Sequence, residues 1–235
     1  MSLMKYSTKI TLFNSYFDKN DRLSFKAILS IFQDVASIHA ESIGVGYKSM
    51  LNQNLYWVLS RIKIDILKMP EINQIVVVET WPHEKGRVDF DRDLKICSED
   101  GEILIIGTSK WCVIDTVQRR LQRADNVNYI GEIFSAVNYE EPFTKITLPN
   151  IDPVFKFNYK VLFSDLDHNQ HMNNTNYANL IASAVENEKY NHFEINFLNE
   201  CKLNDNIAIT HYKDVDQEFV VGSVGDLKTF VALVK

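Results

Sequence analysis

The 235-residue chain is poor in the residues that interrupt regular structure, because it has only 8 glycines and 5 prolines. Together they make up about 5.5% of the chain, whereas average proteins have roughly 12%. This scarcity excludes a collagen-like, low-complexity or linker-dominated protein. We therefore expect the chain to fold along its whole length.

Long apolar runs and paired cysteines are also lacking. No apolar stretch approaches the roughly 18 residues that a membrane-spanning helix requires, and residues 1–10 resemble no signal peptide. Cys97, Cys112 and Cys201 are far apart and form no Cys-x-x-Cys pair of a zinc or redox site. We expect a cytoplasmic protein with free thiols, without membrane insertion, metal or organic cofactor.

A basic excess is lacking as well. The chain has 31 acidic and 25 basic side chains, a formal net charge of −6, whereas nucleic-acid binders usually carry a clear positive excess. With 46% hydrophobic and 24% charged residues, the composition is that of a globular protein. The length allows one large domain or two small ones.

The first half predicts a strand, one long helix and then four strands. Residues 24–43 have apolar side chains at the i, i+3, i+4, i+7 spacing of an amphipathic helix. Ser24 can cap its start and Gly44 its end. Strand patterns cover residues 8–13, 55–67, 74–81, 87–97 and 102–115.

The second half repeats this order after a connector. Between residues 123 and 153 the periodicity weakens, and only a short helix around Ile133 is expected there. A strand at 157–163 and a polar loop at 164–172 follow, and then a helix whose apolar face runs from Tyr177 to Val185. Four strands are expected after it, at about 192–203, 207–214, 218–224 and 227–234. We expect an α+β protein with units at 1–124 and 156–235, joined by a linker at 125–155.

The repeat is also visible in individual residues. A shift of 149 positions lays the segment that starts at Asp18 over the one that starts at Asp167 and keeps an Asp-x-Asn frame. Arg22 then stands where the second half has His171. Farther along, Met69 of the first half stands where the second half has a glutamate, Glu200. Only the second half therefore has the groups for acid–base chemistry.

Polar, chemically usable side chains are densest in the loop 164–174, which precedes the second helix. In extended backbone, Asp167, Asn169 and His171 project to one side and could converge on one pocket. The helix that follows would add free N–H groups and a partial positive charge. These are the parts of an acyl-transfer site; the alternative is an ordinary turn and helix cap.

The segment FSDLDHNQHMNNTNY, residues 163–177, resembles the signature loop of the acyl-acyl carrier protein (acyl-ACP) thioesterases. These enzymes release fatty acids from the fatty acid synthase. Further matching segments lie at residues 55–61, 79–82, 108–111 and 115–121. The resemblance implies a tandem double hot-dog fold, in which each half is an antiparallel β-sheet wrapped around a long α-helix.

The resemblance also implies the site residues. It assigns catalysis to Asp167, Asn169 and His171, and to Glu200 in a Glu-Cys pair on the strand after the second helix. His171 and Glu200 would activate water, Asn169 would orient water or substrate, and Asp167 would fix and charge-balance the site. Cys201 could instead be a nucleophile with His171, although a buried, inert thiol is more typical there.

The implied function is hydrolysis of fatty acyl-ACP to free fatty acid and carrier, by a chain that could also form a homodimer. Alternatives are an acyl-CoA thioesterase and a non-catalytic acyl-binding module. The first half would shape the acyl tunnel, with Ala27 and Ala36 on its inner face. Its tryptophans would be core or tunnel lining; they are Trp57, Trp81 and Trp111.

An acidic carrier protein needs a basic docking surface, because this chain is acidic too. The densest basic segment lies at and after the last strand of the first half, and it is the expected carrier-docking site. Its members are Lys110, Arg119, Arg120 and Arg123. The alternative is a solvated strand end with protective charges.

Overall fold

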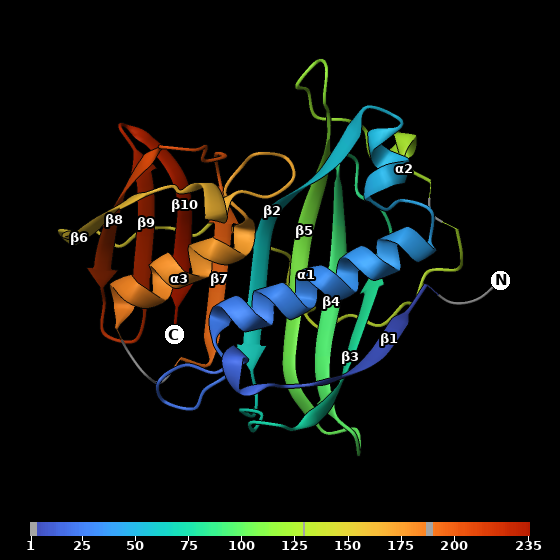
Figure 1. Cartoon of the computed structure of the whole chain (residues 1–235), viewed down its shortest axis with the longest axis horizontal. Helices are drawn as coiled ribbons and strands as arrows, with labels where there is room; N and C mark the ends of the chain where they lie inside the picture. The colour runs from blue at the N-terminus through green and yellow to red at the C-terminus, as the bar shows by residue number, and fades with distance from the viewer. Residues whose placement is uncertain (1–3, 129, 187–189) are drawn as a thin grey trace.

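A computed structural model describes residues 4–128, 130–186 and 190–235. Its strands form a single ten-stranded antiparallel sheet, in the order β1-β3-β4-β5-β2-β7-β10-β9-β8-β6 (Figure 1). The first half contains β1 (Tyr6–Thr11), α1 (Phe25–Ser42), α2 (Tyr47–Leu51), β2 (Leu55–Ile66), β3 (Ile75–Pro82), β4 (Asp89–Ser98) and β5 (Ile103–Asp115). The second half contains β6 (Val154–Lys160), α3 (Asn174–Val185), β7 (His192–Phe197), β8 (Asn206–Lys213), β9 (Glu218–Val224) and β10 (Leu227–Val234).

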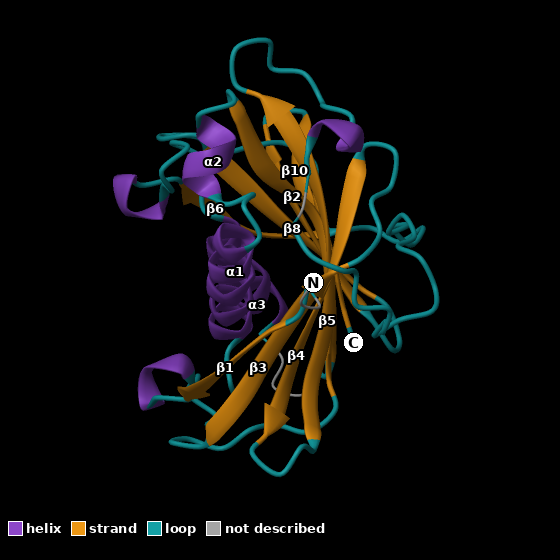
Figure 2. Cartoon of the chain, turned by 90° about the vertical axis from the view of Figure 1, so that its right-hand side faces the viewer, coloured by secondary structure: helices purple, strands orange, loops and turns teal. Residues whose placement is uncertain are grey.

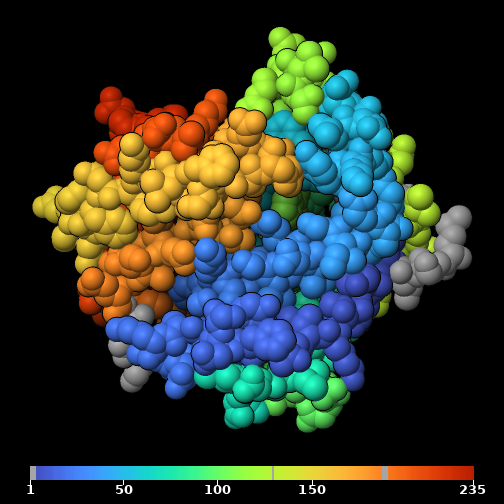
Figure 3. All heavy atoms as spheres, in the orientation of Figure 1, coloured from blue at the N-terminus to red at the C-terminus, as the bar shows by residue number. Residues whose placement is uncertain are grey.

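The two halves share one sheet and one core. β2 pairs with β7, so that Ile62 lies opposite Ile195 and Ile64 opposite Phe193. All four side chains are buried in a core to which both halves contribute. Figure 2 shows α1 and α3 on the same side of the curved sheet, where they pack against each other. On that side, a hollow opens between α1, α2 and the second-half loop (Figure 3).

Helix α1 confirms the amphipathic pattern read from the sequence. The Ser24 side chain accepts a hydrogen bond from the Ala27 N–H at 3.1 Å, and it caps the first turn as predicted. After the last turn, Gly44 has a φ of +81°, a left-handed conformation that favours glycine. The buried face contains Ala27, Ile28, Leu29, Ile31, Phe32, Val35, Ala36 and His39.

The connector contains no helix at Ile133, contrary to the sequence-based expectation. Residues 130–153 form neither helix nor strand, and only a short 3₁₀ helix precedes them, at Ala124–Asn126. Some of its backbone groups bond to side chains of the sheet instead, among them the Ala136 carbonyl and the Asn138 N–H. These groups are satisfied without a helix.

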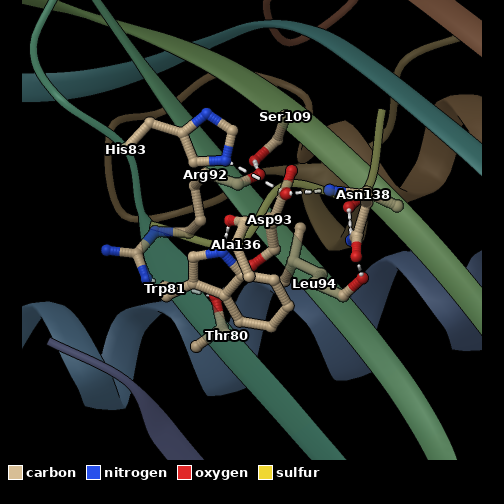
Figure 4. Close-up of polar contacts among 10 residues, drawn as sticks. Thr80, Trp81, His83, Arg92, Asp93, Leu94, Ser109, Ala136 and Asn138 are labelled. Carbon is tan, nitrogen blue, oxygen red and sulfur yellow. Dashed lines mark hydrogen bonds and ion pairs between the residues drawn. The ribbon is translucent and has the colours of Figure 1, made fainter. Parts of the chain in front are cut away.

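Polar contacts attach the connector to the sheet face that is turned away from α1. The Trp81 indole N–H donates to the Ala136 carbonyl at 2.7 Å, and the Asn138 N–H donates to the Asp93 carboxylate at 2.6 Å (Figure 4). The Asn138 side-chain amide donates to a carbonyl of β4 at 2.9 Å and to one of β5 at 2.8 Å. The connector is therefore packed against the sheet.

The strand that was expected to carry Glu200 ends at Phe197, so Glu200 lies in a loop. The reason lies in the neighbouring strand β10, where the pairing register with β9 shifts between Lys228 and Phe230. The N–H groups of residues 198 and 199 both donate to the Thr229 carbonyl, at 2.8 and 3.1 Å. This double contact ends the regular ladder and turns the chain away from the sheet.

The polar loop of the second half is organised by Asp167. Its Oδ1 atom accepts hydrogen bonds from the N–H groups of Asn169 at 2.8 Å and His171 at 3.3 Å. The Asp167 N–H donates to the His171 carbonyl at 2.8 Å. The carboxylate thus holds the backbone of the loop, as an aspartate commonly does in a turn.

The first half contains the same loop, built on Asp18. Its Oδ1 accepts from the N–H groups of Asn20 at 2.8 Å and Arg22 at 3.1 Å, and its N–H donates to the Arg22 carbonyl at 2.8 Å. These bonds match those of Asp167 one for one. The internal repeat is therefore confirmed at the level of hydrogen bonds, with Arg22 in the place of His171.

Replacement of Asp18 by Ala should lower the free energy of unfolding by about 1 kcal/mol, because the loop loses its organising acceptor. Asn20→Ala is the matched control and should change it by less than about 0.5 kcal/mol. Denaturant unfolding measures both variants. Equal losses would contradict the assigned role of Asp18.

Candidate active site

His171 and Glu200 lie in direct contact. The His171 Nε2 atom is 3.1 Å from Glu200 Oε2, and both side chains are partly buried. Backbone contacts fix this geometry, because the Met172 N–H donates to the Cys201 carbonyl at 2.8 Å and His171 forms a β-bridge with Lys202. An imidazole beside a carboxylate is an arrangement that can take up and deliver a proton.

Asp167 and Asn169 are among the residues that line a pocket next to this pair. The pocket lies between α1, α2 and the strands β2, β4 and β5, and it corresponds to the hollow in Figure 3. Above it, the His168 ring meets the Tyr47 ring edge-on, with 4.2 Å between their centroids. Its apolar lining includes Ala36, Val45, Met50, Trp57, Phe90 and Trp111.

The four sequence-predicted residues therefore fall into two groups. His171 and Glu200 contact each other, whereas Asp167 and Asn169 face the pocket. The loop backbone joins the two groups, because the Asp167 carboxylate accepts from both Asn169 and His171. The arrangement places an imidazole–carboxylate pair beside a pocket whose lining is partly apolar.

Two residues that the sequence reading did not assign to catalysis contact Glu200 from the first half. The Tyr56 hydroxyl donates to Glu200 Oε1 at 3.3 Å, and Arg119 Nη2 donates to Glu200 Oε2 at 2.8 Å. Burial and the nearby Glu200 carboxylate raise the pKa of Tyr56 to about 12, so its hydroxyl stays protonated at neutral pH. Tyr56 and Arg119 lie far from Glu200 in the sequence, so no local motif indicates these contacts.

Cys201 is a buried thiol, as its sequence context indicated. Its side chain has 0% exposure, and burial raises the pKa of the thiol. A nucleophilic cysteine requires the thiolate and access to substrate. Cys201 has neither property, because its thiol is buried and its pKa is raised.

The wall of the pocket also contains a buried cation. Arg92 lies on β4, and its Nη1 atom is 3.0 Å from His39 Nδ1 and 3.2 Å from Thr80 Oγ1. Burial, together with the Arg92 charge, lowers the pKa of His39 to about 4, so the imidazole is neutral at physiological pH. In the sheet, β5 lies between β4, which carries Arg92, and β2.

The start of α3 offers fewer free N–H groups than the sequence suggested. The Asn173 side chain accepts from the Thr175 N–H at 2.9 Å, and the Asn173 carbonyl accepts from the Asn176 N–H at 2.9 Å. Both donors are therefore already satisfied. The helix terminus contributes its partial charge rather than a set of open donors.

Three of the four basic residues in the expected docking segment have acidic partners. Lys110 lies between Asp89 and Asp91, with its Nζ at 2.6 and 2.7 Å from their carboxylates. Arg119 contacts Glu200, and the exposed Arg123 pairs with its neighbour Asp125 at 3.1 Å. The fourth, Arg120, is exposed.

Two kinds of feature were not found in the described part of the chain. Among residues 4–128, 130–186 and 190–235, no group of three or more His, Cys, Asp or Glu side chains could hold a metal ion. Within the same residues, no helix combines the length and the apolar character needed to cross a membrane.

Comparison with known sequences gives matches along most of the chain. Residues 4–129 match the sequence model of the acyl-ACP thioesterase N-terminal domain, and residues 150–226 match that of the C-terminal domain. The oleoyl-acyl carrier protein thioesterase 2 of Arabidopsis thaliana, a chloroplastic protein, is 28% identical over 209 residues. That match covers 79% of this chain and 57% of the relative, so this chain corresponds to little more than half of its length.

Solved structures share the whole fold. A 12:0-ACP thioesterase from Umbellularia californica superposes with a TM-score of 0.86 and 22% identity, covering 99% of this chain and 96% of the other. An acyl-ACP thioesterase from Bacteroides thetaiotaomicron gives 0.84, also at 22% identity, with 98% and 97% covered. At this identity the likeness shows a common fold.

Proposed function

The chain belongs to the acyl-ACP thioesterase family, and on that premise we propose that it hydrolyses fatty acyl-ACP thioesters to free fatty acid and carrier protein. One observation carries the proposal: the His171–Glu200 pair lies beside an apolar pocket. Tyr56 connects the two, because it lines the pocket and its hydroxyl contacts Glu200.

In the proposed reaction, a water molecule attacks the carbonyl carbon of the thioester. His171 and Glu200 together take up the proton of this water, and the carbonyl oxygen becomes negatively charged in the tetrahedral intermediate. The C–S bond then breaks, and the proton is delivered to the departing thiolate. The products are a free fatty acid and the carrier with its thiol.

Asn169 and Asp167 have supporting roles in this scheme. Asn169 faces the pocket, where its amide would orient the water or the thioester. The Asp167 carboxylate holds the backbone of its loop by hydrogen bonds, and Asp18 does the same in the first half. The first half has Arg22 and Met69 at the positions that correspond to His171 and Glu200. We therefore regard Asp167 as the residue that positions Asn169 and His171 and balances the charge of the site.

Replacement of His171 by Ala, or of Glu200 by Gln, should lower kcat for acyl-ACP by at least about 10²-fold with little change in KM. General acid–base groups act mainly in the transition state, which explains the effect on kcat alone. Cys201→Ser is the matched control and should keep most of the activity. If Cys201→Ser were inactive while Glu200→Gln worked normally, the assignment of His171 and Glu200 would be wrong. A mechanism with Cys201 as the nucleophile would then be favoured.

We further propose that each half is a hot-dog unit wrapped around one helix, and that the first half forms the acyl tunnel. The pocket supports this proposal because its apolar lining comes mainly from α1, α2, β2, β4 and β5 of the first half. Ala36 of α1 lines the pocket, whereas Ala27 is buried in the core and is not among the lining residues. Of the two alanines expected on the inner face, Ala36 is therefore the better probe of the proposed tunnel.

Ala36→Phe should therefore shift the released products toward shorter fatty acids, because the new ring occupies pocket space. Ala27→Phe serves as the control for overpacking and should leave the product profile unchanged where the protein still folds. Gas chromatography of acids released from a series of acyl-ACPs gives the profile. A folded Ala36→Phe variant with the parent profile would place the acyl chain elsewhere.

The carrier would dock on the basic segment after β5. Arg119 and Lys110 are unsuitable probes of docking, because Arg119 contacts Glu200 and Lys110 is neutralised by two aspartates. Arg120 and Arg123 are exposed. The pair of Arg123 with Asp125 is itself exposed to solvent, so both guanidinium groups can face an acidic partner. Attraction between such surfaces is effective within a Debye length of about 10 Å at 0.1 M salt.

Reversal of Arg120 and Arg123 to Glu together should raise KM for acyl-ACP severalfold and weaken its dependence on salt. Turnover of a short synthetic thioester should stay nearly unchanged, because that substrate needs no docking surface. Steady-state kinetics at two salt concentrations measures both effects. An unchanged KM for acyl-ACP would move docking to another surface, with Lys48, Arg61 and Lys63 the next candidates.

Three further expectations stay predictions: the division of the chain at 1–124, 125–155 and 156–235, operation in the cytoplasm, and a homodimer. A comparison of acyl-ACP with acyl-CoA as substrate separates the proposed activity from its nearest alternative, an acyl-CoA thioesterase. Release of acid from either substrate distinguishes both enzymes from an acyl-binding module.

A further inference from the structure

We propose that Arg119 and Tyr56 are positioning residues that hold the Glu200 carboxylate toward His171. Together we call them the Glu200 clamp. The clamp belongs to the first half and acts on a residue of the second half, so the first half would do more than shape the tunnel. The proposal rests on the proposed hydrolysis, in which Glu200 works with His171.

Three hydrogen bonds close a triangle around the carboxylate. Arg119 Nη2 donates to Glu200 Oε2 at 2.8 Å, Arg119 Nη1 donates to the Tyr56 hydroxyl at 2.7 Å, and that hydroxyl donates to Glu200 Oε1 at 3.3 Å. Both carboxylate oxygens are therefore engaged. Because Oε2 also lies 3.1 Å from His171 Nε2, the clamp fixes the face that Glu200 presents to the imidazole.

The chain around Arg119 is built to aim its side chain at this site. Arg119 has a φ of 54°, and its N–H donates to the Asp115 carbonyl at 2.9 Å. The Asp115 carboxylate accepts from the N–H groups of Val117 at 2.8 Å and Gln118 at 2.7 Å. This turn at the end of β5 brings Arg119 back toward Tyr56, which lies on β2 opposite residue 114.

The exposure of the pair argues against a mainly structural role. The Arg119 side chain is 52% exposed and that of Glu200 29% exposed. Ion pairs at such a surface contribute roughly 0–1 kcal/mol to stability, because water and salt screen them. The specific two-sided geometry therefore matters more for the orientation and charge of Glu200 than for folding.

The titratable and charged groups around Glu200 come from four segments besides its own loop. They are His171 from the polar loop, Arg119 from the β5 turn, Tyr56 from β2 and Cys112 from β5. Burial and the nearby carboxylates of Asp89 and Glu200 raise the pKa of Cys112 to about 11, so this thiol is neutral at physiological pH. Arg119 is thus a permanent cation beside Glu200, and its loss removes a positive charge from the site.

Three variants test the clamp with a short synthetic thioester, which removes carrier docking from the measurement. Arg119→Met should lower kcat at least about tenfold with little change in KM, and should move the acid limb of the kcat profile to higher pH. Arg119→Lys keeps the charge and should restore most of the rate and the position of the limb. Tyr56→Phe should lower kcat severalfold without moving the limb.

The matched control is Arg87→Met, because Arg87 is an exposed arginine of the first half outside the site. It should leave kcat, KM and the pH profile unchanged. If Arg119→Met behaves like this control, or if Arg119→Lys is as impaired as Arg119→Met with an unmoved acid limb, the clamp is overturned. Hydrolysis by the parent enzyme would remain intact in both cases.

An NMR spectrum of the His171 ring, recorded at one fixed pH, gives a readout that requires no activity. Because the clamp holds the Glu200 carboxylate against the imidazole, Arg119→Met should move the His171 ring signals away from their parent positions, and Arg119→Lys should return them most of the way. Such a shift in a chain that hydrolyses no thioester would support the clamp while the proposed function fails. Ring signals that stay in place in Arg119→Met would overturn the clamp whatever the activity.

Discussion

The antiparallel pairing of β2 with β7 is the contact on which the rest of the structure depends. It joins two sets of strands into one sheet and places the buried side chains of both in one core. The same register brings the start of β2, with Tyr56, and the turn after β5, with Arg119, next to the loop that carries Glu200. Without this junction, Glu200 would lose its partners from the first half.

The two copies of the Asx-organised loop show how one architecture serves two purposes. Asp18 and Asp167 make the same backbone hydrogen bonds, so the local fold depends on the aspartate in each half. The residue four positions later differs. Arg22 donates to the Tyr190 carbonyl at 2.7 Å and ties the first half to the second, whereas His171 meets Glu200.

Much of this structure could be predicted from local patterns in the sequence. Helix α1 and its Ser24 cap follow from spacing and capping chemistry, and the loop at Asp167 follows from its Asx-rich composition. The placement of Glu200 could not be predicted in this way. Its strand ends early because of an irregularity in β10, a neighbour that is distant in sequence.

The same limit applies to the connector and to the clamp. The segment around Ile133 has no helix. Asn138, which follows it, bonds to β4 and β5 instead, and these partners cannot be predicted from the segment itself. Arg119 looked like a docking cation because its sequence neighbours are basic, and only the fold shows that it faces Glu200.

The proposed hydrolysis is tested most directly by incubating the purified chain with an acyl-ACP and measuring free fatty acid and free carrier thiol together. We predict equal amounts of both over many turnovers. Acyl-ACP that stays bound and intact would contradict the proposed activity.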